Sequence, residues 1–240
     1  TRLFVAASDV YKRQVINEFD NVYDEIEEEQ QLLVDDTYGS LRIISDDVVI
    51  RFERRERNQL YSIKVGNEEL LQAPMRLNFW RALTDNDRGT RAGSRLGCWR
   101  DAGDTPGIFN NTKWSIEGYK ILDDGKKVVV TSGATVCTQP ESKASIVYTI
   151  TSKGMEINLH FYPDPSLPEI PEVSLLFELP KDFENVTYRG NGPEENYIDR
   201  ANAAKIGLYN TTVSDMWVDY LKPQECGNRT GVRYATVSYT

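Results

Sequence analysis

The sequence predicts a mainly β protein made of antiparallel strands. Hydrophobic side chains alternate with polar ones along most of the chain from Leu41 onward, and this period of two is typical of half-buried strands. The alternating runs are short, and clusters of Gly, Asp, Asn and Ser separate them at intervals that suit hairpins. A helical period is almost absent from this part of the chain. With 240 residues, the chain has room for one large sandwich domain.

The first half of the chain supplies several of these runs. Residues 48–52 and 61–65 alternate apolar with polar side chains, and the second run ends at Gly66-Asn67, a common hairpin turn. Residues 114–116 and 128–130 alternate in the same way on either side of Asp123-Asp124-Gly125. Because each turn is short, the strands beside it are expected to pair antiparallel.

The second half continues the pattern. Residues 146–150 lead through Ser152-Lys153-Gly154 into residues 155–161, so a long hairpin is expected there. Shorter alternating runs follow at residues 175–179, 186–188, 206–208 and 232–236. The expected product is one antiparallel sandwich.

Two segments at the start are set apart from this pattern. Residues 1–14 fit neither a signal peptide nor the alternation that follows, so we leave this leader out of the fold as non-native sequence. Residues 15–31 belong to an acidic run, since residues 17–36 hold nine acidic residues and no Lys or Arg. Apolar residues at three- and four-residue steps favour a short acidic helix, and repulsion between like charges favours a solvated linker. Both alternatives stay open.

One internal segment also breaks the alternation. Residues 75–107 contain six Arg and four Asp, and they show no period of two. Leu96 and Trp99 allow one or two helical turns at most. A long irregular segment inside a β domain often carries function.

Charge and composition exclude several classes of function. The net charge is −9, and the acidic run accounts for the whole excess, so the chain has no basic surface for nucleic acid or anionic lipid. The mean hydropathy is −0.51, and no apolar stretch approaches the ~20 residues that span a membrane. Three cysteines without a CxxC pair are typical of free thiols in a reducing, cytoplasmic location.

No residue pattern indicates a catalytic or metal site. His160 is the only histidine and lies in an alternating run, where a structural role is expected. Glu194 and Glu195 are adjacent, so in an extended chain their side chains point to opposite sides and cannot flank one glycosidic bond. The run Asp85–Gly89 lacks the later Gly and Glu of a calcium loop. We therefore assign no catalytic and no metal-binding residue to this chain.

Three sequence blocks carry a family resemblance. They are PMRLNFWRALTDNDRG (residues 74–89), YRGNGPEENYIDR (188–200) and SDMWVDYLKPQECGNRTGVRY (214–234). Together they resemble the C-terminal domain of the long β-galactosidases of glycoside hydrolase family two, which in some bacteria is a separate small chain. The resemblance covers residues 32–240 and implies an antiparallel supersandwich of the galactose mutarotase type. Family members continue for some tens of residues beyond the match to Thr240, which implies a domain truncated at its C-terminus.

The resemblance also implies where function lies. In the family, both catalytic glutamates and most ligands of magnesium and sodium belong to a (β/α)₈ barrel that precedes this domain, so none is carried over here. The loop after the DNDxG motif lies at the mouth of the active site and moves when a galactoside binds. Its matching residues are Gly89, Thr90, Arg91, Gly93, Ser94, Arg95 and Gly97, and the glycines suit a hinge. Asp85, Asn86 and Asp87 are expected to fix the base of the loop by capping turns. Asp199 and Arg200 are expected to be available for pairing within an architectural block.

These inferences predict a supporting role. The chain is expected to shape and cover the active site for hydrolysis of terminal β-D-galactosides, with a catalytic large chain as its partner and no cofactor of its own. Self-association is left open. The alternatives are a stand-alone carbohydrate-binding module and an aldose epimerase. An epimerase needs a general acid and a general base, usually His and Glu, and this chain has a single histidine.

Overall fold

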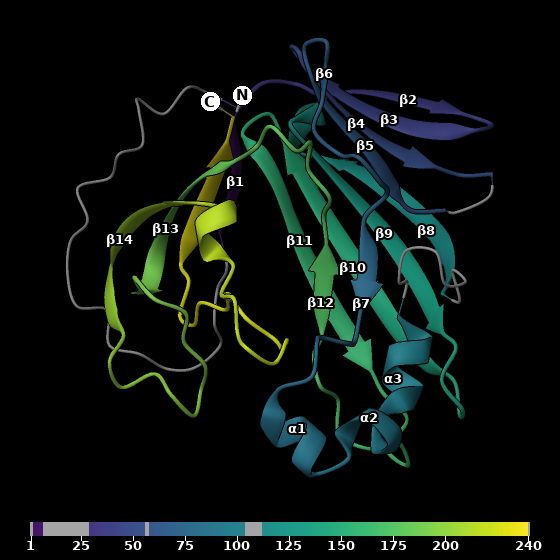
Figure 1. Ribbon diagram of the computed structural model, residues 1–240. Coiled ribbons are helices and arrows are strands. Elements are labelled where there is room, and N and C mark those ends of the chain that lie inside the picture. The colour runs from purple at the N-terminus through teal and green to yellow at the C-terminus, as the bar shows by residue number, and fades with distance from the viewer. Residues whose placement is uncertain (1, 7–28, 56–57, 104–111, 240) are drawn as a thin grey trace. The chain divides into compact units, whose positions relative to one another are not determined.

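The computed structural model is mainly β, with several antiparallel sheets and a few short helices (Figure 1). The structure describes residues 2–6, 29–55, 58–103 and 112–239. Contacts divide the chain into two compact units. We call residues 29–180 the central unit, and residues 1–28 with 181–240 the terminal unit. The organisation of residues 32–240 as a single domain stays a prediction.

The central unit contains two larger antiparallel sheets and one small one. A five-stranded sheet runs in chain order through β2 (Leu33–Thr37), β3 (Ser40–Ser45), β4 (Val48–Glu53), β5 (Leu60–Val65) and β6 (Glu68–Glu69). A four-stranded sheet has the order β11-β10-β9-β8, with β8 (Lys113–Leu122), β9 (Lys127–Val136), β10 (Ser142–Thr151) and β11 (Gly154–Tyr162). The small sheet pairs β7 (Arg76–Asn78) with β12 (Ser174–Leu176).

Hairpins form where the sequence places turn residues. β10 and β11 pair from Thr151 with Gly154 at the turn to Lys143 with Tyr162 at the far end, which confirms the long hairpin. Between β8 and β9, the 3₁₀ turn η1 (Asp123–Gly125) has positive φ at all of its residues. Asp and Gly tolerate this backbone conformation better than other residues, so the turn is built from the residues that it requires.

One hydrophobic core joins the sheets of the central unit. Strands β3, β4, β9 and β10 turn alternate side chains into it, among them Leu41, Ile43, Ile50, Phe52, Val128, Val130, Ile146 and Tyr148. The rings of Phe52 and Tyr148 meet edge to face with centroids 4.9 Å apart. The Tyr148 hydroxyl donates to Met75 Sδ at 3.8 Å, and burial raises the pKa of Tyr148. Each such apolar side chain contributes about 1.5–3 kcal/mol to the free energy of unfolding.

Short helices occupy the segment that the sequence left irregular. They are α1 (Asp85–Gly89), α2 (Ala92–Arg95) and α3 (Gly97–Ala102), which follow one another closely in Figure 1. The expectation of at most one or two helical turns in this segment was therefore too low. Buried side chains at Ala92, Leu96 and Trp99 recur at three- and four-residue steps, which is the helical period that the charged neighbours obscured.

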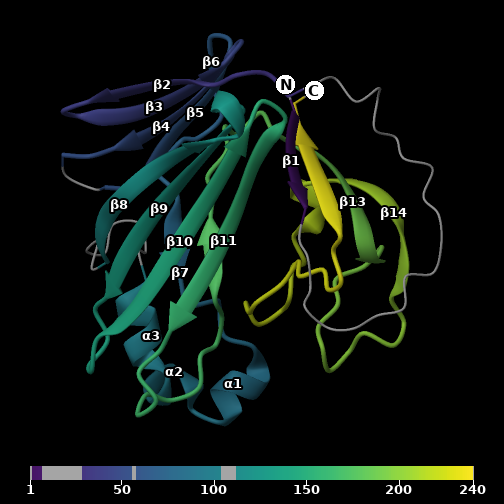
Figure 2. The same cartoon turned by 180° about the vertical axis from the view of Figure 1, so that it is seen from behind.

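The terminal unit is built on a four-stranded antiparallel sheet with the order β1-β15-β13-β14. Its strands are β1 (Arg2–Ala6), β13 (Asn185–Gly192), β14 (Lys205–Thr212) and β15 (Tyr234–Ser238), and a 3₁₀ turn, η2, spans Ser214–Met216. Figure 2 shows β1 beside β15, so residues 2–6, which we left out of the fold, contribute a strand. The rest of the expected leader and residues 15–28 of the acidic segment lie outside the described residues. That residues 1–14 are non-native stays a prediction.

Among the described residues, no helix is long and apolar enough to cross a membrane.

Candidate functional site

The segment from Thr84 to Ala102 carries every residue that the sequence singled out for the substrate-proximal loop and its base. Thr84 is the N-cap of α1, and α2 and α3 follow with only one or two residues between helices. The segment is therefore a series of three short helices rather than an extended loop. We call residues 84–102 the helical segment.

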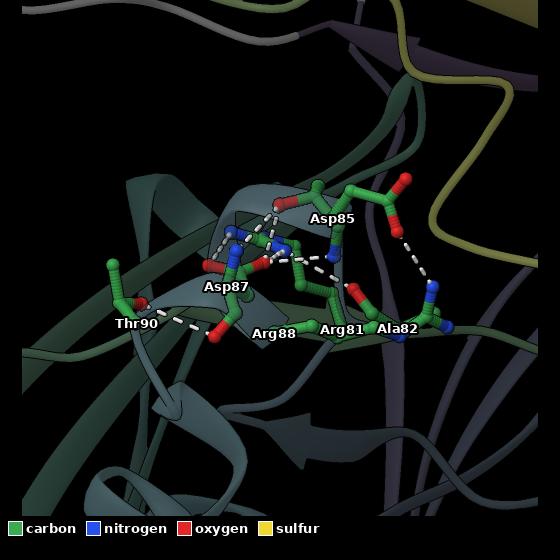
Figure 3. A network of polar contacts seen from close by, with 7 residues as sticks. Arg81, Ala82, Asp85, Asp87, Arg88 and Thr90 are labelled. Carbon is green, nitrogen blue, oxygen red and sulfur yellow. Dashed lines mark hydrogen bonds and ion pairs between the residues drawn. The ribbon is translucent and has the colours of Figure 1, made fainter.

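Asp87 organises the start of this segment (Figure 3). Its Oδ2 accepts hydrogen bonds from the Thr84 backbone N and the Thr84 hydroxyl, each at 2.8 Å. The Thr84 side chain in turn accepts from the Asp87 backbone N at 3.2 Å, so the two residues form a reciprocal capping box. Arg81 adds an ion pair, with its NH1 2.6 Å from Asp87 Oδ2.

These contacts lower the pKa of Asp87. Partial burial opposes ionisation, but the hydrogen bonds from Arg81 and Thr84 and the Arg81 charge outweigh it, and the pKa falls from 3.8 to about 2. The charge of Asp87 also lies in the first turn of α1, where the helix dipole favours an anion. Asp87 therefore holds the base of the segment as a carboxylate.

The other two residues of the expected base have smaller roles. Asp85 lies on the exposed surface of α1 and pairs with Arg88 at 3.0 Å, as Figure 3 shows. Asn86 is exposed, and its backbone carbonyl accepts from the Thr90 backbone N at 3.1 Å. Of Asp85, Asn86 and Asp87, it is thus Asp87 whose side chain takes part in capping α1.

The expected hinge glycines do not occupy left-handed backbone. Positive φ within the helical segment occurs at Arg91, with φ 56° and ψ 32°, and not at Gly89, Gly93 or Gly97. Gly89 ends α1, and an added Cβ would meet nothing within 4 Å. A hinge built on glycines therefore stays a prediction, and the position whose backbone is strained for its residue type is Arg91.

The remaining loop residues divide into exposed and anchored ones. Thr90, Arg91, Ser94 and Arg95 are exposed. The Thr90 hydroxyl donates to the Asp87 carbonyl at 3.1 Å, whereas Arg95 reaches outward to an ion pair with Glu169. The middle of the segment thus presents polar and cationic side chains to solvent.

Trp99 anchors the far end of the helical segment. It is fully buried, and its Nε1 donates to the Pro168 carbonyl at 3.1 Å. Its ring lies 5.8 Å from that of Phe79 and 5.9 Å from that of Phe161 on β11. Both ends of the segment are therefore fixed, the first by the Asp87 network and the second by aromatic packing.

A second polar network, in the terminal unit, was missed by sequence reasoning. The Glu195 carboxylate is 7% exposed and pairs with Arg200, while its Oε2 accepts from the Gly227 backbone N at 2.7 Å. Tyr220 donates its hydroxyl to the same carboxylate. Burial opposes ionisation, yet these bonds together lower the pKa of Glu195. Arg200, which we expected to be available for pairing, forms its ion pair with Glu195.

Asn196 ties the same network to the sheet. Its side chain is buried and bridges both ways: Nδ2 donates to the Asn191 and Glu194 carbonyls at 3.0 Å, and Oδ1 accepts from the Thr230 backbone N at 2.9 Å. A buried amide with every bond made stabilises one arrangement of its neighbours. The only sequence signal was that residues 188–200 and 214–234 resemble the same family. That resemblance does not indicate which side chains touch.

The residues that we set aside as non-catalytic occur at several places along the chain. His160 is exposed on β11, Glu194 is exposed, and Cys98, Cys137 and Cys226 form no disulfide. Over the described ranges, no three His, Cys, Asp or Glu side chains are placed to hold a metal ion. The helical segment presents exposed polar side chains between its two anchored ends.

Comparison with known proteins gives this geometry a context. Residues 45–240 match the protein family described as Beta galactosidase small chain. The chain is 33% identical to a β-galactosidase of Priestia megaterium over 86% of this chain and 19% of that protein. It is 34% identical to a β-galactosidase of Streptococcus thermophilus over 77% of this chain and 17% of that protein, and 32% identical to one of Halalkalibacterium halodurans over 81% and 20%. The chain thus spans about a fifth of the length of these curated relatives.

Proposed function

The chain belongs to the β-galactosidase small-chain family, and on this premise we propose that it shapes and covers the active site of a β-galactosidase whose catalytic groups lie in another part of the enzyme. The whole enzyme hydrolyses terminal β-D-galactosides with retention, through two carboxyl groups that flank the glycosidic bond. This chain contributes surface and position. We also propose that it associates with a large catalytic chain, which its place in a small-chain family supports.

The observation that carries the proposal is the construction of the helical segment. Its start is held by the Asp87 capping box and the Arg81 ion pair, and its end by the buried Trp99. Between these anchors, Thr90, Arg91 and Ser94 are exposed. A segment with fixed ends and an exposed polar middle is suited to closing over a polar ligand, since hydroxyl-rich sugars need hydrogen-bonding partners that are already in place.

The finer features of the proposal come from the family. The sheets are proposed to belong to a supersandwich of the galactose mutarotase type, and the enzyme is proposed to be cytoplasmic. Magnesium and sodium are proposed to bind in the catalytic barrel. The described residues hold no group of three or more His, Cys, Asp or Glu side chains suited to a metal.

A chimeric enzyme tests the proposal. In the Priestia megaterium β-galactosidase, the segment that this chain matches is replaced by this chain, and hydrolysis of o-nitrophenyl β-D-galactoside is measured. We expect the chimera to hydrolyse the galactoside and the same enzyme without the segment to be inactive. Deleting residues 90–95 from the chimera should lower kcat and raise KM together, because the exposed middle is lost while both anchors remain.

Two outcomes would sink the proposal. One is full activity of the enzyme that lacks the segment. The other is a chimera that sediments as a folded assembly, binds a galactoside and still has unchanged kinetics after the deletion of residues 90–95.

A further inference from the structure

A pocket of about 410 Å³ opens on the five-stranded sheet of the central unit. The β2–β3 turn, Tyr38-Gly39, forms one wall, and β4 with the residues after it forms the other. The pocket is lined by side chains of the sheet face that turns away from Ile50 and Phe52, the two core residues of β4. It shares no residue with the helical segment.

Two arginines line this pocket, and their guanidinium groups form none of the ion pairs found among the described residues. They are Arg51 on β4 and Arg55 just after it. Most other described arginines, including the neighbouring Arg42 and Arg54, form ion pairs with Asp or Glu. A guanidinium group is the side chain best shaped to bind a carboxylate through two parallel hydrogen bonds. Two of them against the single carboxylate of Glu53 give the lining a net positive charge, which favours a ligand with a negative charge.

Each guanidinium group lies over an aromatic ring. Arg51 lies 5.4 Å from the Tyr61 ring centre, and Arg55 lies 5.4 Å from the Tyr38 ring centre. Stacking of this kind fixes the plane of the guanidinium and leaves its N–H edge for a ligand. The Nε of Arg51 is buried and has no hydrogen-bond partner within the described part of the chain, and an unmet buried donor is costly unless a ligand satisfies it.

The rest of the pocket suits a sugar ring. Tyr38 is 90% exposed, so its ring offers a flat apolar surface of the kind on which pyranoses pack. Gly39 permits the close approach of Arg55, because an added Cβ would lie 3.0 Å from Arg55 Nε. Glu53 also lines the pocket, and its Oε1 accepts a hydrogen bond from the Arg55 backbone N, which fixes the chain next to Arg55.

We propose that this pocket binds an acidic pyranose, a sugar that carries a carboxylate, as a uronic acid does. The carboxylate lies against Arg51 and Arg55, and the ring lies on Tyr38. This site goes beyond the proposed active-site role and does not depend on it, since it lies on a different part of the central unit.

Calorimetric titration of the full 240-residue chain tests the site, with D-galacturonate, D-galactose and sodium sulfate as separate probes. We expect D-galacturonate to bind and D-galactose to bind at least about tenfold more weakly, which corresponds to one lost bidentate contact of about 1.4 kcal/mol. Arg51→Gln and Arg55→Gln should each weaken D-galacturonate about tenfold, and Tyr38→Ala should weaken it as well. Arg42→Gln is the matched control, because it removes the same charge from the neighbouring strand but lies outside the pocket.

The other outcomes each overturn the proposal. Equal binding of sulfate and D-galacturonate would mean an adventitious ion only. Equal affinity for D-galactose and D-galacturonate would show that the pocket does not recognise the carboxylate. Absence of D-galacturonate binding at millimolar concentration, or equal loss in Arg42→Gln and Arg55→Gln, would remove the site. Because Arg55 is an exposed side chain, Arg55→Gln keeps the test valid if Arg51→Gln fails to fold.

Discussion

Replacing Asp87 by Asn should weaken the base of the helical segment at neutral pH. The change keeps the size of the side chain but removes the charge that pairs with Arg81 and leaves an amide facing donors from Arg81 and Thr84. The folded-state pKa of about 2, against an ordinary 3.8, corresponds to about 2.5 kcal/mol at about 1.36 kcal/mol per pKa unit. Because the Asp87 side chain is 20% exposed, solvent screening reduces this figure, and we expect about 1–2 kcal/mol.

The same shift fixes the pH dependence. Since the pKa of Asp87 is lower in the folded chain than in the unfolded one, its contribution is complete above the unfolded value of 3.8 and is lost as the pH falls toward about 2. The difference in stability between the native chain and Asp87→Asn should therefore be largest near neutral pH. It should shrink by about half near pH 3.

Hydrogen exchange of residues 84–103, followed by mass spectrometry, measures this local stability without requiring both units to unfold together. Asp85→Asn is the matched control, because Asp85 is an exposed carboxylate paired with Arg88 in the same helix and should contribute about 0.3–0.5 kcal/mol. Equal exchange in the two variants at neutral pH, or a difference that does not change with pH, would refute the reasoning about Asp87.

Three further predictions follow from single positions. Gly89→Ala should leave the fold intact, since the new Cβ meets no atom within 4 Å. As a substitution at a proposed hinge, it should shift kcat and KM of the chimera together. Lys120→Ala, on the exposed surface of β8, is the control and should change neither. Glu195→Gln should lower the stability of the terminal unit by about 2 kcal/mol near pH 7 in urea unfolding, and this loss should diminish below the ordinary pKa of a glutamate because the pKa of Glu195 is lowered. Gly192→Ala should destabilise the same unit by about 1–3 kcal/mol in thermal melts, because the Cβ would lie 2.3 Å from the Tyr188 hydroxyl; a melt like that of the native chain would contradict this contact.

The strands could be predicted because their signal is local. A period of two and a short turn are properties of neighbouring residues, so the hairpin of β10 and β11 and the run on β4 were found where the structure has them. The first strand of the five-stranded sheet, β2 (Leu33–Thr37), was not predicted. It overlaps the end of the acidic run, where Asp35 and Asp36 obscured the alternation. In the structure, these two carboxylates pair with Arg42 and Arg54.

The candidate site could be located from the sequence but not built from it. The motif around Asp85–Gly89 identified the segment, whereas its helical form depends on packing of the buried Trp99 against Phe79 and Phe161, residues outside the segment. Likewise, Glu195 pairs with Arg200 and Tyr220 only because the folded chain brings them together, and no local pattern specifies this. The positive φ at Arg91 shows the same limit, since sequence propensity assigns such positions to glycine.

The central claim is that this chain supports β-galactosidase catalysis and does not perform it. The most direct measurement is hydrolysis of o-nitrophenyl β-D-galactoside by three preparations: the purified chain, the Priestia megaterium β-galactosidase without its matching segment, and a mixture of the two. We predict no turnover by either component alone and turnover in the mixture that rises to saturation as the chain is added. Turnover by the purified chain, abolished by a Glu→Gln change within it such as Glu195→Gln, would contradict the claim.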